Sequence, residues 1–136
     1  MDNIRLGNSL AIFRGDLIMH LFMIYIGGKH EQSLVELHDI RFVVAPSIEE
    51  TYDALRKSWW GVPTSLHLDA WGIVNYVDGY NIHISRDQQL ENANKLFFVN
   101  LGGCDNKQFM ELHKNIVVIA NDEFEAKQKA VKKIDH

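Results

Sequence analysis

Glutamate and histidine occur twice in this chain in the same triplet, with a spacing that suits proton transfer or ligand binding. Glu36 and His38 are separated by one residue, and so are Glu111 and His113. In an extended segment, residues two apart point to the same side of the chain, so each carboxylate is expected beside its imidazole. A carboxylate in that place holds the proton on one ring nitrogen and makes the other nitrogen more basic. This arrangement suits a general base or a metal ligand.

A third pair, His67 and Asp69, has the same spacing but no copy elsewhere in the chain. For the two repeated pairs a structural role is the alternative, in which Glu and His fix the path of the chain where a strand begins. Because His67 and Asp69 are not repeated, they cannot be a requirement of a repeated fold, and they are the better candidates for a specific site. The candidates for ligand or partner binding are Glu36, His38, His67, Asp69, Glu111 and His113.

Metal and nucleotide binding are two further interpretations of these motifs. If the two halves of the chain pack about a pseudo-twofold axis, His38 and His113 approach each other with their glutamates behind them, a donor set that suits zinc or iron. The sequence alone assigns no cofactor, no definite metal ligand and no catalytic residue. The glycine pairs Gly27-Gly28 and Gly102-Gly103 lack the third glycine and the following helix of a dinucleotide-binding loop, so a nucleotide is not expected.

An internal repeat of 75 residues relates the two triplets. Residues 21–57 and 96–132 align without a gap and are identical at 11 of 37 positions, where composition alone gives about 2 or 3. Chance similarity of two strand–turn–strand segments is the alternative. We interpret the match as a duplication.

Each copy predicts two strands followed by a helix. The expected strands are residues 21–26, 40–45, 96–101 and 116–120, which are continuous apolar runs. Ser47 with Glu50, and Asp122 with Glu125, have the spacing of a helix cap. The expected apolar stripes are Ile48, Tyr52, Leu55 and Trp59 in the first helix, and Phe124, Ala130, Val131 and Ile134 in the second. The pattern predicts an α+β fold with a two-layer mixed β-sheet and two helices on one face.

Only the first copy continues further. Residues 66–85 are expected to form strands around Asp78-Gly79, with Val77 opposite Tyr80, because Asp-Gly tolerates the positive φ angles of a tight hairpin turn. The expected organisation is an extension at residues 1–18 and a single domain at 19–136, built from half-units 21–95 and 96–136. The extension is either an arm packed through Leu10, Ile12 and Phe13, or a segment ahead of an alternative start at Met19.

The second copy has no counterpart of residues 62–95. A repeat that lacks one hairpin leaves a sheet edge or an apolar strip uncovered, and a second chain commonly covers such surfaces. The sequence therefore predicts a homodimer. Trp59 is expected in the core, whereas Trp60 and Trp71 are candidates for an exposed partner surface.

Composition excludes several classes of protein. The chain has 136 residues, 46% of them hydrophobic, which is typical of one globular domain. A net charge of −4 gives no general attraction to nucleic acid. The apolar run 17–26 is too short to cross a bilayer, and the single cysteine, Cys104, allows no internal disulfide. We therefore expect a cytoplasmic protein that binds neither nucleic acid nor membrane.

Several linked motifs resemble one known family. The segments LFMIYIGG at 21–28, ELHD at 36–39, LHLD at 66–69 and VDGY at 77–80, with FFVNLGG at 97–103, are similar to the bacterial family named domain of unknown function 1543. The resemblance covers residues 19–134. It implies a small cytoplasmic bacterial protein with no established activity, whose members generally continue beyond the point where this sequence ends.

Two functions of different classes follow from these observations. The first is a homodimeric module that binds a small molecule or a partner segment in a cleft between the half-units, lined by Glu36, His38, His67 and Asp69. The alternative is a small hydrolase or metal-dependent enzyme, in which one imidazole acts as the base and the carboxylates orient it.

Overall fold

The computed structural model describes residues 2–4, 13–14, 17–86 and 93–134. The chain forms two compact units, each of which we describe by itself. The first-half unit comprises Ala11–Asn75, and the second-half unit comprises Met1–Leu10 with Tyr76–His136. Leu10 and Ile12, which were expected to anchor an N-terminal arm, lie outside the described residues.

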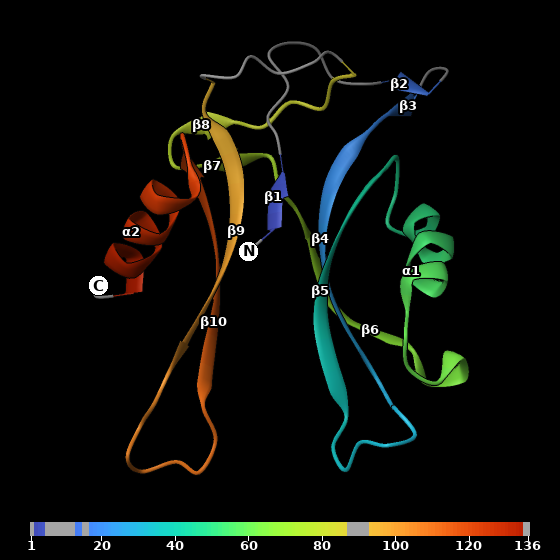
Figure 1. The fold of residues 1–136 in the computed structure, drawn as a ribbon. Coiled ribbons are helices and arrows are strands. Elements are labelled where there is room, and N and C mark those ends of the chain that lie inside the picture. Colours follow the sequence, from blue (N-terminus) through green and yellow to red (C-terminus); the bar gives the residue numbers. More distant parts are fainter. Residues whose placement is uncertain (1, 5–12, 15–16, 87–92, 135–136) are drawn as a thin grey trace. The chain divides into compact units, whose positions relative to one another are not determined.

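The first-half unit is built on a three-stranded antiparallel sheet (Figure 1). β4 (His20–Gly28) is the central strand, with β5 (Leu37–Ala45) on one side and β6 (His67–Ile73) on the other. Between β5 and β6 the chain forms η1 (Glu49–Thr51), α1 (Tyr52–Ser58) and η2 (Pro63–Ser65). A short pair, β2 (Phe13–Arg14) with β3 (Leu17–Ile18), precedes β4.

Alternation along β4 separates the face that packs on the helical segment from the opposite face. Phe22, Ile24 and Ile26 point to the same side, where they pack with Leu55 and Trp59 from the helical segment. The intervening residues point to the other side of the sheet, away from α1. The first helix stripe is thus confirmed for Ile48, Leu55 and Trp59, which are buried, whereas Tyr52 is 37% exposed.

The second-half unit has the same order of hairpin and helix. β9 (Lys95–Gly103) pairs with β10 (Leu112–Ala120), and α2 (Glu123–Ile134) follows. The pairing register repeats at the 75-residue offset, because His20 lies opposite Ala45 and Lys95 lies opposite Ala120. β1 (Asp2–Ile4) occupies the other edge of β9, and β7 (Tyr76–Val77) pairs with β8 (Tyr80–Asn81).

The α+β class is confirmed, but the sheets differ in detail from the expected mixed sheet. Every ladder among the described residues is antiparallel, and each half of the repeat has its own three-stranded sheet with its own helix. The common offset fits a duplication, which stays an interpretation. No helix in the described segments is long and apolar enough to serve as a transmembrane span.

Two local predictions need correction. The hairpin at Asp78-Gly79 does form, with Val77 opposite Tyr80 and φ angles of 52° and 85° at the turn, but residues 67–73 pair with β4 instead of extending that hairpin. The second helix stripe is wrong in part: Ala130 is buried as expected and packs beside Ala126, but Phe124 and Val131 are exposed. Small side chains allow α2 to approach its sheet closely.

The two predicted helix caps differ in outcome. At α2, the amide of Glu125 donates to the Asp122 side chain at 2.8 Å, as a cap requires. In the first half, a 3₁₀ turn precedes α1 and no side chain caps either segment. The Ser47 hydroxyl instead donates to the Glu50 carboxylate at 3.4 Å.

Candidate metal and ligand site

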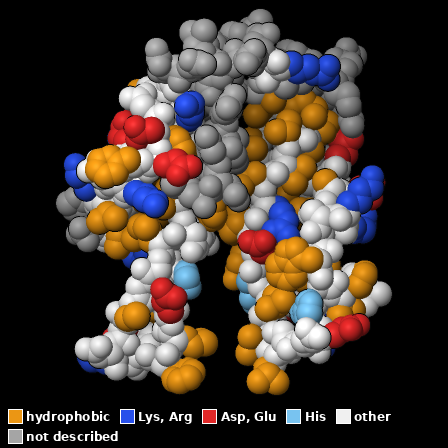
Figure 2. All heavy atoms as spheres, in the orientation of Figure 1, with side chains coloured by type: hydrophobic (Ala, Val, Ile, Leu, Met, Phe, Trp, Pro, Cys, Tyr) orange, Lys and Arg blue, Asp and Glu red, His pale blue; other side chains and the backbone are white. Residues whose placement is uncertain are grey.

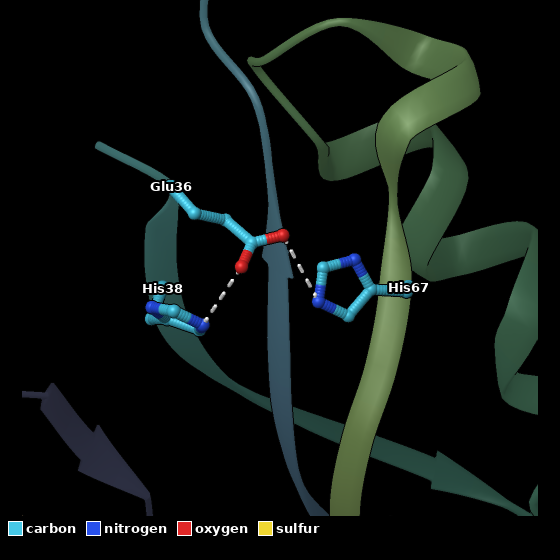
Figure 3. A group of neighbouring side chains, drawn as sticks. All are labelled: Glu36, His38 and His67. Atoms are coloured by element: carbon cyan, nitrogen blue, oxygen red, sulfur yellow. Dashed lines mark ion pairs between the residues drawn. The ribbon is translucent and has the colours of Figure 1, made fainter. Parts of the chain in front are cut away.

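Four of the six candidate residues form one cluster in the first-half unit. The Glu36 carboxylate lies between the two imidazole rings, with one oxygen 3.7 Å from His38 Nε2 and the other 3.3 Å from His67 Nε2 (Figure 3). Asp69 makes a second bridge, at 3.5 Å to His38 Nε2 and 3.2 Å to His67 Nε2. We call these four residues the Glu/His cluster.

Strand register explains why the two histidines meet. His38 on β5 and His67 on β6 both lie directly opposite Gly27, on either side of the central strand. Their rings therefore project from the same face of the sheet, over a position of β4 that has no side chain. A Cβ atom on Gly27 would lie 2.7 Å from His38 Cδ2 and 2.9 Å from His67 Nε2. The glycine thus provides the space in which the rings converge.

A β-bulge brings the fourth member into the cluster. Ile26 pairs with Leu68 and Tyr25 pairs with Ala70, so Asp69 is the extra residue of β6. Bulges re-aim side chains and are common beside functional sites. Here the bulge places the Asp69 carboxylate beside both rings.

Backbone contacts fix the orientation of His67. Its Nδ1–H donates to the Ser65 carbonyl oxygen at 3.1 Å, which directs Nε2 toward the two carboxylates. Ser65 is itself held in place, since the Lys29 amide donates to its hydroxyl at 2.8 Å and that hydroxyl donates to the Val62 carbonyl at 2.6 Å. On the other side of the cluster, the His38 ring stacks on Tyr25 with ring centres 5.2 Å apart.

The cluster is a donor set of the kind that binds transition metals. Ligand atoms of Glu36, His38 and His67 all lie within 4.8 Å of one another. Tetrahedral zinc, with bonds near 2.1 Å, places neighbouring ligand atoms about 3.4 Å apart. In the cluster, His67 Nε2 lies 3.3 Å from one Glu36 oxygen, close to that value, and His38 Nε2 lies 3.7 Å from the other Glu36 oxygen. Two histidines with carboxylates are also a set found at hydrolytic zinc sites.

The corresponding region of the second-half unit contains only half of this arrangement. His113 lies opposite Gly102, and its Nε2 is 3.5 Å from Glu111. Its Nδ1 is 3.1 Å from the side-chain oxygen of Asn100, the residue that corresponds to Tyr25. Glu111 reaches over Gly102, where a Cβ would contact its carboxylate. Among the described residues no strand equivalent to β6 flanks Gly102, so His67 and Asp69 have no counterpart. We call this arrangement the half-site.

Sequence reasoning missed three features of the site. Gly27, Tyr25 and Ser65 contribute space, a stacking surface and an orienting carbonyl. Of these, only Gly27 had a sequence signal, because its glycine pair recurs ahead of both Glu-Leu-His triplets.

The loops that lead to the triplets carry exposed apolar side chains, which the sequence analysis also overlooked. Leu34 and Val35 precede Glu36, and Phe109 and Met110 precede Glu111 at the same offset. All four side chains are strongly exposed, and Figure 2 shows hydrophobic side chains at the ends of both hairpins. Trp59 is in the core as expected, and Trp60 and Trp71 are about half exposed.

Comparison with known proteins identifies relatives of the chain. A family model described as Domain of Unknown Function (DUF1543) matches residues 33–84, the range that contains the whole Glu/His cluster. A solved structure titled "Crystal structure of a protein Il1583 from Idiomarina loihiensis" is 41% identical, with a TM-score of 0.72. The match covers 85% of this chain and 73% of that one. No curated protein matches the sequence. The chain therefore belongs to the family of Domain of Unknown Function (DUF1543).

Proposed function

We propose that the first-half unit binds a divalent transition metal ion of the zinc type at the Glu/His cluster. The observation that carries the proposal is the convergence of two imidazole nitrogens and two carboxylates, at 3.2 to 3.7 Å, over a glycine. An ion-pair network alone is the structural alternative. It needs neither the glycine gap, over which the two rings converge, nor the bulge, which places Asp69 beside both rings.

The same cluster supports binding of a small ligand at the metal. Its side chains are 34% to 45% exposed, so water and small molecules can reach a bound ion. Structural zinc sites are closed by four protein ligands, whereas sites that act on ligands use three and keep the fourth position open. Glu36, His38 and His67 are the three residues whose ligand atoms all lie within 4.8 Å of one another, so a fourth position is left for a ligand. The protein is therefore a metal-dependent ligand-binding module. Because metal-bound water is a nucleophile, hydrolysis is the second candidate function of this site.

Zinc titration of matched variants tests the proposal. In competition with a chromophoric chelator, His38→Ala is expected to weaken zinc binding at least about 100-fold, since loss of supporting contacts alone costs 10- to 100-fold. The matched control is His113→Ala at the half-site, which is expected to leave the affinity unchanged. Equal affinity of the His38→Ala variant and the wild type would overturn the proposal.

We also propose that the chain forms a homodimer through the free part of the β9 edge. β1 pairs only with Leu96–Phe98, and among the described residues no strand flanks Val99–Gly103 on that side. Such edges attract a further strand. Sedimentation over a concentration series is expected to show a monomer–dimer equilibrium, and a monomer at all concentrations well above micromolar would exclude it.

A further inference from the structure

An apolar groove lies beside the Glu/His cluster on the face of the same sheet that points away from α1. It has a volume of 300 Å³, within the lower range of small-molecule sites. No residue that lines it carries a formal charge. The lining residues are Met23, Tyr25, Ile40, Ala70, Trp71, Gly72, Ile73 and Val74.

The groove and the cluster are continuous along the central strand. Met23 and Tyr25 precede Gly27 at intervals of two residues, so all three positions face the same side of the sheet. Tyr25 both lines the groove and stacks on His38, and Ala70 directly follows Asp69. A molecule bound at the cluster therefore has apolar surface next to it.

The charges of the cluster define the head group of that molecule. Glu36 and Asp69 repel an anion when no metal is present. A divalent ion held between them offsets their negative charge, and its open coordination position accepts an oxygen donor such as a carboxylate. The uncharged groove next to it favours a short hydrocarbon chain, because burying apolar surface is favourable. The groove offers no charged side chain that could pair with a charged group on the ligand.

We infer that the ligand of this site is a small carboxylic acid or carboxylic acid derivative, with its head group on the metal and a short apolar chain in the groove. This inference rests on the proposed metal site. It adds the chemical class of the ligand to that site and assigns a binding role to the groove.

The test uses two hydroxamates of different chain length as probes, titrated into the zinc-loaded protein by calorimetry. Each methylene that leaves water tightens binding about fourfold. Octanohydroxamate with three methylenes of its chain buried in the groove is therefore expected to bind about 60-fold more tightly than acetohydroxamate. Chelator-treated protein is expected to bind neither probe. Equal affinities for the two probes on the zinc-loaded protein would overturn the inference, and so would unchanged octanohydroxamate binding without metal.

A variant that fills the groove separates its role from that of the metal site. Gly72 lies opposite Met23, and a Cβ at this position would meet no atom within 4 Å, so Gly72→Leu extends into free space. We expect Gly72→Leu to bind zinc and acetohydroxamate like the wild type. The ratio of octanohydroxamate affinity to acetohydroxamate affinity is expected to fall at least about tenfold. The control, Gly103→Leu, also enters free space, on β9, and is expected to keep the preference.

The possible failures are distinguishable. If the wild type binds no zinc, the proposed function and this inference both fail. If zinc and acetohydroxamate bind but chain length has no effect, or if Gly72→Leu keeps the full preference, only the groove assignment fails.

Discussion

The two halves of this protein share a hairpin, a register and a Glu-Leu-His triplet, yet among the residues that the structure describes only the first half assembles a cluster of metal-ligand type. The difference is the third strand. In the first half, β6 pairs along β4 from Phe22 to Gly27 and brings His67 and Asp69 to the same glycine as His38. In the second half, β1 covers β9 only at Leu96–Phe98. The repeated triplet thus supplies half of the donors, and a non-repeated strand supplies the other half.

The cores of the two halves are expected to respond alike, in contrast to the sites. Phe22 and Phe97 occupy equivalent positions and are 2% and 1% exposed. Replacing either with alanine leaves a cavity and is expected to lower the free energy of unfolding by about 3–5 kcal/mol. Chemical denaturation measures both variants. A loss below about 1 kcal/mol for one of them would show that the two cores are not equivalent.

Removing the contribution of β6 should convert the cluster into a half-site. His67→Ala leaves Glu36 and His38 in an arrangement similar to that of Glu111 and His113. We expect zinc affinity to fall at least about 100-fold, because an imidazole ligand is lost. Competition with a chelator measures the affinity. Zinc binding that survives this change would mean that the repeated triplet is sufficient and that β6 is not the deciding element.

Gly27 and Gly102 occupy equivalent positions in the two halves, so the same substitution at each of them compares the two sites. Gly27→Ala places a methyl group against both rings, whereas Gly102→Ala meets chiefly the flexible Glu111 side chain. We expect Gly27→Ala to weaken zinc binding about tenfold by pushing the rings apart, as for other contacts that orient ligands. Gly102→Ala is expected to leave it unchanged. If both variants bind zinc like the wild type, the space over Gly27 does not matter for the site.

The smallest expected effect concerns the helix that follows the half-site. The Lys129 side chain and the Asn121 amide, which donate hydrogen bonds to the Glu125 carboxylate, hold the pKa of Glu125 below its ordinary value of 4.5. Stability from this group is therefore present above pH 4.5 and lost as the pH falls through the lowered pKa. In urea titrations, Glu125→Gln should flatten this acid dependence slightly. An unchanged pH profile would contradict the assignment.

Local sequence patterns predicted the elements of this fold well. The 75-residue offset placed both hairpins, and the Asp78-Gly79 turn has the expected positive φ angles. The pairing of β6 with β4 could not be predicted, because it joins residues some 45 positions apart through a bulge at Asp69 that has no local signature. The apolar stripe of α2 was misjudged because alanines, not large side chains, make its contacts.

For the site, residue type and spacing gave six candidates and placed four of them, Glu36, His38, His67 and Asp69, in one cleft. These four do lie together in the first-half unit, and their binding role stays a prediction. The expected approach of His38 to His113 stays a prediction, since these residues belong to different units. What the sequence lacked was the register that places two histidines opposite one glycine.

The number of zinc ions bound per chain tests the central claim most directly. Native mass spectrometry of the wild-type protein with zinc in modest excess is expected to show one ion per chain, held by the Glu/His cluster, and none at the half-site. Two ions per chain would show that the third strand is not required. Less than about 0.1 ion per chain would remove the metal site altogether, because sites of this type normally bind tightly.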